Sequence, residues 1–224
     1  MNEKLKQPVD RGEQIKQGVF LEMFGLNAEQ MEILKGRVKQ ADGLVRVFVH
    51  PMATDQVGEN IENQERVFQF FARTVNSDEA PPVIILENRT EMDHWPKDEG
   101  EFSEGVISLP YDVYVVPTLL HVPYPIVPGK PIKDEVDSSG RLTDESFEYA
   151  REGFTKFVEF LDSIGVRKVL VGGTSLVIEH DYIAKCVGNF INFMDELSTI
   201  DVKLSLGTAP LNRTDLKKLR PDLM

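Results

Sequence analysis

Hydrophobic residues recur at helical spacing over residues 144–164 and are followed by a short unbroken apolar run. This spacing predicts an amphipathic helix, with an apolar face made of Phe147, Ala150, Phe154, Phe157, Val158, Leu161 and Ile164. Gly165 is expected to end the helix, because glycine readily adopts the left-handed conformation found at helix ends. The next run, Val169, Leu170 and Val171, does not alternate, which is typical of a strand buried on both faces. Residues 166–175 therefore predict a central parallel strand that ends in a glycine turn.

The same two patterns place the remaining elements. β-Branched and aromatic runs predict strands at 44–50, 83–87, 106–109, 112–118 and 201–206. Helical spacing predicts helices at 11–24, from Asn27 onward, at 62–75, at 181–197 and at 212–219. Asn27 and Gln30 have the spacing of a capping box at the start of the second helix, whose apolar stripe is Met31, Leu34 and Val38.

Strands and helices alternate through most of the chain. This order predicts a three-layer α/β fold, with an open, mainly parallel sheet of about five strands that is Rossmann-like or flavodoxin-like. We expect a single α/β domain over residues 43–224. Residues 1–42 are expected to form a tail and a helical pair packed on that domain. The pattern does not define the order of the strands.

A long segment without helical or strand pattern covers residues 119–142 and contains four prolines. Loops of this length in a compact domain are usually lids, binding loops or disordered excursions. Its centre, VPYPIVP, is too apolar to favour simple disorder. We expect this loop to cover a site at the sheet edge.

The charge and the cysteine content oppose some classes of binding partner and indicate the cellular compartment. A net charge of −12 and an isoelectric point near 4.8 oppose nonspecific binding to nucleic acid or to an anionic membrane. The single cysteine, Cys186, cannot form an internal disulfide, which fits a reducing compartment. The first residues lack the apolar core of a secretory signal, and no apolar run is long enough to span a membrane. We therefore expect a soluble, cytoplasmic protein.

Polar residues follow the predicted strands, and in a parallel sheet the carboxyl ends of the strands share one edge. We predict a site at this edge with His50, Glu87 and His121 as catalytic candidates. The candidate ligand-binding residues are Arg89, Gly172, Gly173, Thr174 and Ser175. No local spacing specifies a metal or a cofactor.

Each candidate also has a structural interpretation. His50 and His121 are suited to act as general bases, or each is bonded to a backbone carbonyl. Glu87 either pairs with Arg89, or holds a substrate hydroxyl or amine while Arg89 holds an anion. The Gly172–Ser175 turn offers amide and hydroxyl groups to a phosphate or carboxylate, or its glycines serve only close packing.

Cys186 follows a glycine-ended strand and lies in a predicted helix. In this it resembles the cysteine hydrolases of the isochorismatase and nicotinamidase type, which have a cysteine at the start of such a helix. Here the cysteine lies well beyond the turn, and the first strand ends in His-Pro where that family has an aspartate. Cys186 also shares a helical face with Ile183 and Phe190, which predicts a core residue.

Three functions fit these observations. The first is binding of a small polar or anionic metabolite at the carboxyl edge of the sheet. The second is a hydrolase that uses His/Glu acid–base or metal chemistry at the same edge. The third is a non-catalytic interaction or scaffold protein, which an exposed stripe on Met31, Leu34 and Val38 would favour. Neither the ligand nor the oligomeric state follows from the sequence.

Overall fold

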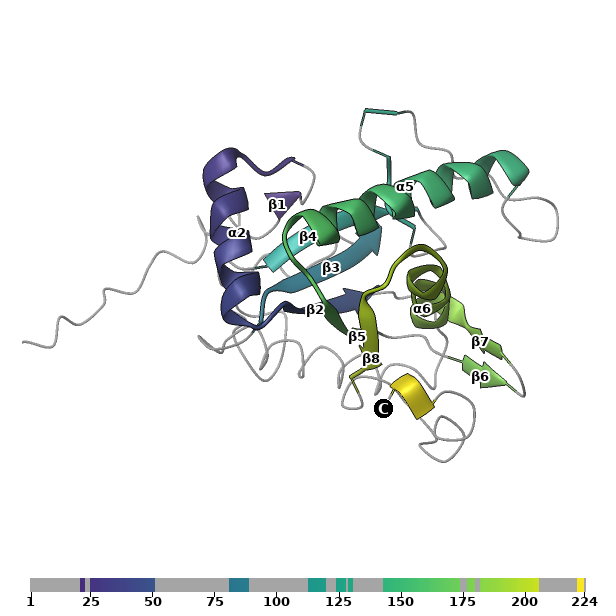
Figure 1. The fold of residues 1–224 in the computed structure, drawn as a ribbon. Coiled ribbons are helices and arrows are strands. Elements are labelled where there is room, and N and C mark those ends of the chain that lie inside the picture. The colour runs from purple at the N-terminus through teal and green to yellow at the C-terminus, as the bar shows by residue number, and fades with distance from the viewer. Residues whose placement is uncertain are drawn as a thin grey trace, which may run out of the picture.

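The protein is built on a parallel β-sheet (Figure 1). The computed structural model describes residues 21–22, 25–50, 81–88, 113–119, 124–127, 129–130, 143–173, 177–179, 182–205 and 221–223. The sheet has the strand order β1-β4-β3-β2-β5-β8, and every neighbouring pair is parallel. Its strands are β1 (Leu21–Glu22), β2 (Leu44–Val49), β3 (Val83–Asn88), β4 (Val113–Thr118), β5 (Lys168–Gly173) and β8 (Asp201–Leu204). The predicted open parallel α/β architecture is confirmed.

From β2 to β8, the order of the strands reverses once. From β2 the chain adds β3 and then β4 on one side of the sheet. It then crosses back to add β5 and β8 on the other side of β2. This is the Rossmann type of strand order, and it creates a topological switch point between β2 and β5.

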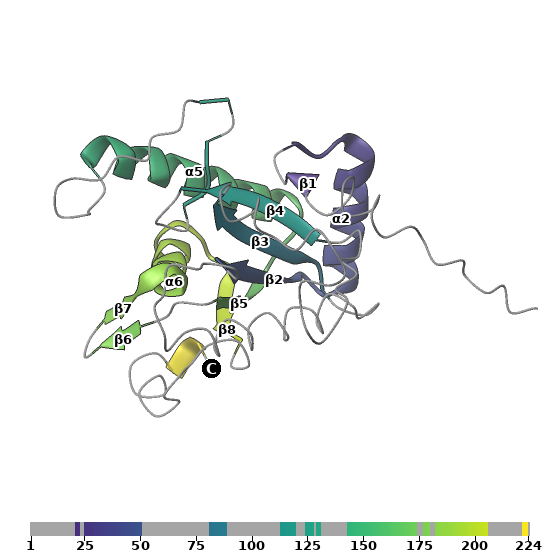
Figure 2. The same cartoon turned by 180° about the vertical axis from the view of Figure 1, so that it is seen from behind.

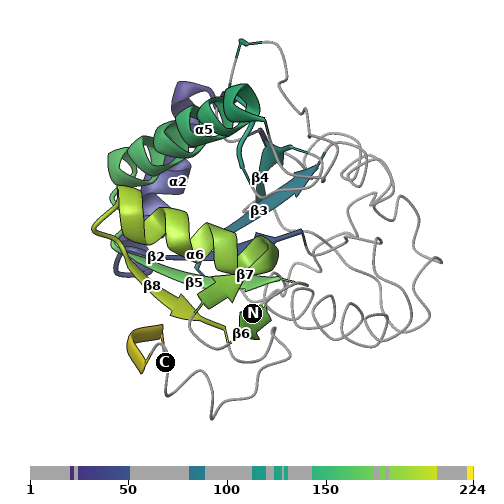
Figure 3. The same ribbon diagram turned by 90° about the vertical axis from the view of Figure 1, so that its right-hand side faces the viewer.

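Both faces of the sheet are buried. Among the described residues, one face packs against α2 (Ala28–Gln40), α5 (Asp144–Ser163) and α6 (Lys185–Leu197), which lie together on one side of the strands (Figures 2 and 3). Val47, Val171 and Phe154 belong to this core. The residues that point to the opposite face are buried as well: Phe48, Val83, Ile85 and Val115. The sheet is therefore the middle layer of three.

Local signals fix the two helices that frame the core. The predicted capping box at the start of α2 is present, with Asn27 and Gln30 each bonding the other's backbone amide. Thr143 caps α5 through the amide of Ser146, and Gly165 follows the helix with a left-handed φ of 82°. Six of the seven residues predicted to form the apolar face of α5 are buried. The exception is Phe147, which is 41% exposed.

Two helix predictions are wrong in part. Leu21 and Glu22 form β1, which pairs with β4, where we predicted the end of a helix. Residues 177–179 and 182–184 form an antiparallel pair, β6 (Val177–Glu179) with β7 (Tyr182–Ala184), so α6 begins at Lys185 and not at Asp181. Ile183 fits the helical spacing of Val187 and Phe190. However, β-branched and aromatic residues in both triplets favour strand pairing.

The segment after β4 turns back onto its own strand. Thr118 pairs with Pro125. The amide of Leu119 donates to Tyr124 (3.0 Å), and the amide of Ile126 donates to Pro117 (2.8 Å). We call residues 124–127 the strap. As the apolar sequence of the predicted loop indicates, Tyr124 and Val127 are buried in the core. Pro117 lies beyond the two β4 residues that pair with β1, as expected for a proline near a strand end.

The last described residues lie at the β8 edge of the sheet. The short helical turn η2 (Pro221–Leu223) packs on β8, with Leu223 in the core and Lys203 donating to the carbonyl of Asp222. The predicted helices at 62–75 and 212–219 and the strand at 106–109 lie outside the described residues. None of the described helices is long and apolar enough to cross a membrane.

Candidate functional site

Four predicted site residues meet at the carboxyl edge of the sheet. His50 follows β2, Glu87 is the next-to-last residue of β3, and Gly172 and Gly173 end β5. Because all these strands are parallel, their carboxyl ends share one edge, as predicted. Arg89, His121, Thr174 and Ser175 lie outside the described residues.

The side chain of His50 crosses the end of the neighbouring strand. Its backbone has a φ of 46°, a left-handed conformation that is uncommon for residues other than glycine. Its amide donates to the carbonyl of Leu86 (2.8 Å), and its Nε2 lies 2.9 Å from the hydroxyl oxygen of Thr118. Since β3 separates β2 from β4, the imidazole spans the end of β3. The side chain of His50 therefore reaches from the end of β2 to the end of β4.

Three polar side chains are buried along this line. His50 is 3% exposed, Thr118 is 2% exposed and Glu87 is fully buried. Glu87 is the residue of β3 that follows Leu86, the register partner of Val49, so it lies beside the position of His50. A buried carboxylate or imidazole is costly unless other groups satisfy it. Buried polar residues therefore end three adjacent strands at this edge of the sheet, and two of them, His50 and Thr118, contact each other.

Gly173 marks the closest approach of β2, β5 and α6. A Cβ atom at this position would overlap the carbonyl oxygen of Val49 and would lie 2.8 Å from Cγ2 of Val187. The φ of Gly173 is 155°, which side-chain-bearing residues rarely adopt. Close packing thus accounts for this glycine. Val49, which precedes His50, and Val187, which follows Cys186, therefore both lie beside Gly173.

Cys186 lies in the first turn of α6, which differs from its predicted place in the middle of a helical face. It is half-buried and packs against the core, as predicted for a core residue. Burial, with a smaller contribution from the nearby Cys186, raises the pKa of Tyr124 to about 12. The thiol is therefore close to the strap residue Tyr124. Since β5 and β8 are parallel and α6 connects them, α6 begins on the carboxyl side of the sheet.

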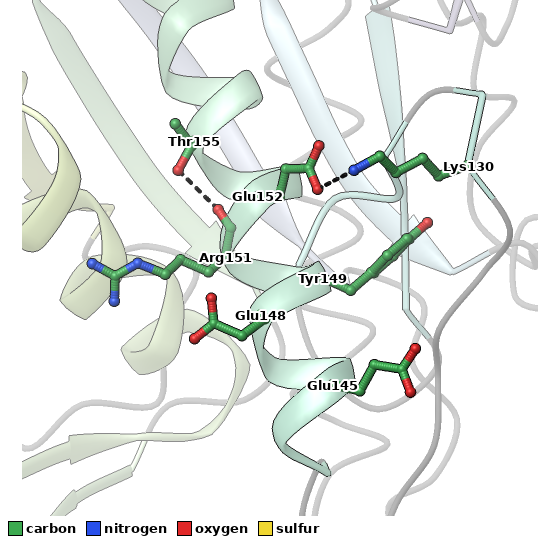
Figure 4. Close-up of a pocket in the computed structure, with 7 residues that line it drawn as sticks. All are labelled: Lys130, Glu145, Glu148, Tyr149, Arg151, Glu152 and Thr155. Carbon is green, nitrogen blue, oxygen red and sulfur yellow. Dashed lines mark hydrogen bonds and ion pairs between the residues drawn. The ribbon is translucent and has the colours of Figure 1, made fainter.

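A separate open pocket of about 490 Å³ lies on α5. Figure 4 shows its lining residues: Lys130, Glu145, Glu148, Tyr149, Arg151, Glu152 and Thr155. Several of its charges are already paired, with Lys130 Nζ 2.5 Å from Glu152 and Arg151 2.7 Å from Glu196. The hydrogen bond from Lys130 is the main reason why the pKa of Glu152 lies below its usual value. No local sequence pattern predicts this pocket, because Lys130 is far from α5 in the chain and meets Glu152 only in the folded protein.

Thr118 ends a predicted strand at this edge, but we assigned it no catalytic or ligand-binding role from the sequence. Its role depends on a contact with a residue 68 positions away, which no local pattern reports. Ser205, which follows β8 at the same edge, is also buried. No group of three or more histidine, cysteine, aspartate or glutamate side chains in the described part of the chain is arranged to hold a metal ion.

Comparisons with known proteins give no relative. No protein-family model, curated protein or solved structure matches the chain. The geometry of the carboxyl edge is therefore the basis for a functional proposal.

Proposed function

We propose that the protein binds a small polar or anionic metabolite at the carboxyl edge of its sheet, at the switch point between β2 and β5. Open parallel α/β sheets bind their ligands in the crevice at such a point. The observation that carries the proposal is the reversal of strand order between β2 and β5 at the edge where His50 and Glu87 are buried.

The first turn of α6 supports an anionic group on the ligand. Val187 of this turn contacts the position of Gly173, so the start of the helix lies beside the crevice. The free amides and the dipole of a helix N-terminus favour negative charge. His50 and Glu87 supply a donor or acceptor on the opposite side of β2. A ligand that carries both an anionic and a neutral polar group fits this arrangement.

A thermal-shift screen against a library of small polar and anionic metabolites tests the proposal, because a ligand that binds only the folded state raises the melting temperature. A matched pair of variants then places the ligand. Thr118→Val removes the hydroxyl that bonds His50 at similar volume, whereas Thr118→Ser keeps it. The proposal expects the shift to fall in Thr118→Val and to persist in Thr118→Ser. Equal shifts in both variants would place the ligand elsewhere.

A hydrolase is the second candidate, and the position of Cys186 favours it. The thiol lies in the first turn of α6, on the carboxyl side of the sheet, where the helix N-terminus favours a negatively charged group. His50 follows Val49 and Cys186 precedes Val187, and both valines approach Gly173. Cleavage of a panel of ester and amide substrates by the wild type, Cys186→Ser and His50→Asn tests this candidate. Asparagine tolerates the left-handed backbone at position 50. Activity that survives both substitutions would exclude the two residues from catalysis.

The interaction-protein hypothesis loses its supporting feature. Leu34 and Val38 are buried in the core, and Met31 packs against it. The stripe that was expected to be exposed in a scaffold protein therefore faces the sheet.

A further inference from the structure

His50 and Thr118 are 3% and 2% exposed. A ligand reaches this pair only when a neighbouring segment moves. The strap is joined to the same end of β4 by backbone bonds on both sides of Thr118, at Pro117 and at Leu119. Among the described segments, the strap is therefore the one whose movement changes the surroundings of Thr118 most directly.

Tyr124 and Val127 anchor the strap in the core, where Tyr124 packs edge-on against Phe193 of α6 with ring centroids 4.7 Å apart. Two further features fix the strap to α5. The hydroxyl of Tyr149 accepts a buried hydrogen bond of 3.1 Å from the amide of Val127. The backbone of Pro125 lies so close to α5 that a Cβ atom on Gly153 would overlap its carbonyl oxygen. An exposed ion pair between Lys130 and Glu152 continues the contact beyond the strap. The pairing of β2 with β5, in contrast, extends over six residues of each strand.

We propose that the strap controls access to the His50–Thr118 pair and opens by detaching from α5 while the sheet stays folded. A short segment can open locally while a sheet with longer strand pairing stays folded. The inference that this opening admits a ligand rests on the proposed function. The opening itself is measurable without a ligand, so the two proposals can fail separately.

Gly153→Ala is the sharpest test. Alanine favours a helix interior over glycine, so the substitution does not weaken α5 itself, but its methyl group displaces Pro125. The matched control is Gly36→Ala in α2, where an added Cβ atom meets nothing within 4 Å. Tyr149→Phe provides a second variant that removes the acceptor of Val127 without adding volume.

Two readouts follow the opening in the full chain. Acylation by diethyl pyrocarbonate, mapped to His50 by peptide mass analysis, reports access to its imidazole. Amide hydrogen exchange reports the strap through Leu119, Ile126 and Val127, and the sheet through Ser205, whose amide donates to Val171. We expect Tyr149→Phe to raise both the His50 acylation rate and strap exchange about tenfold, the factor for one buried hydrogen bond. Gly153→Ala should raise both rates as well, because its methyl group displaces Pro125. Ser205 exchange should not rise in these two variants, and neither His50 acylation nor strap exchange should rise in the Gly36→Ala control.

Three results would overturn the proposal. Unchanged exchange at the strap amides would show that the contacts with α5 do not hold the strap. Faster strap exchange with unchanged His50 acylation would show that the strap does not cover the pair. Equal acceleration at Ser205 would show that His50 reacts through unfolding of the whole sheet.

Discussion

Gly173→Ala tests the close approach that defines the switch point. The added Cβ atom would overlap the carbonyl oxygen of Val49 and crowd Cγ2 of Val187 at 2.8 Å. Two costs follow. Overpacking of a tight contact typically destabilises by about 1–3 kcal/mol, and a φ of 155° strains a residue with a side chain by about 1–3 kcal/mol. The lower conformational entropy of alanine in the unfolded chain offsets about 0.4–1 kcal/mol.

The expected net loss is therefore about 1–5 kcal/mol, out of a total stability on the order of 5–15 kcal/mol. Urea unfolding followed by circular dichroism measures it. With a slope of about 2–3 kcal/mol per molar urea, the midpoint should fall by roughly 0.3–2.5 M. Gly36→Ala, which has free space around the added atom, should instead raise the midpoint, because it gains about 0.5–1 kcal/mol of helix propensity.

The urea midpoints of Gly173→Ala and Gly36→Ala, each compared with that of the wild type, test this contact. If Gly173→Ala unfolds at the midpoint of the wild type or above it, β2 and β5 do not approach each other as closely as the structure has them. The location of the proposed crevice would then lose its geometric basis. A lower midpoint with an unchanged slope would confirm the contact and leave the two-state transition intact.

Two further predictions concern the core and the strap. Tyr124 has its pKa raised from 10.0 to about 12, so its contribution to stability is complete below pH 10 and is lost as the pH rises to 12, by up to about 1.4 kcal/mol per pH unit. Urea midpoints of the wild type and Tyr124→Phe, measured across this range, should therefore converge with rising pH, and a constant difference would contradict the shift. Leu34→Ala should cost about 2–5 kcal/mol, because Leu34 is fully buried. Ile33→Ala on the same helix should cost about 0.5 kcal/mol or less, because Ile33 is 52% exposed. Similar losses in both variants would mean that α2 packs on a different face.

The sequence contained the signals for α2, α5, β2, β3 and β5, because these depend on neighbours within a few positions. The capping box of Asn27 and Gln30 acts over three residues, and the apolar face of α5 repeats at the helical period. Phe147 shows the limit of this reasoning. Its position satisfies the helical pattern, but its side chain is exposed because the core does not extend over it. The start of α6 was missed for a related reason. Three-residue strands are too short to show alternation, so the helical spacing of Ile183 was misleading.

The site depended on contacts that no local pattern contains. Alternating strands and helices predict a parallel sheet, but the order β4-β3-β2-β5 follows from how whole layers pack, and this order alone creates the switch point. His50 was identified as a strand-end residue, whereas its reach to Thr118 required β3 to lie between them. Close packing was one of two interpretations of Gly173, and only the tertiary structure shows that Val49 and Val187 are the residues that leave no room for a side chain. The sequence thus determined which polar residues end the strands, and the tertiary structure decided which of them meet.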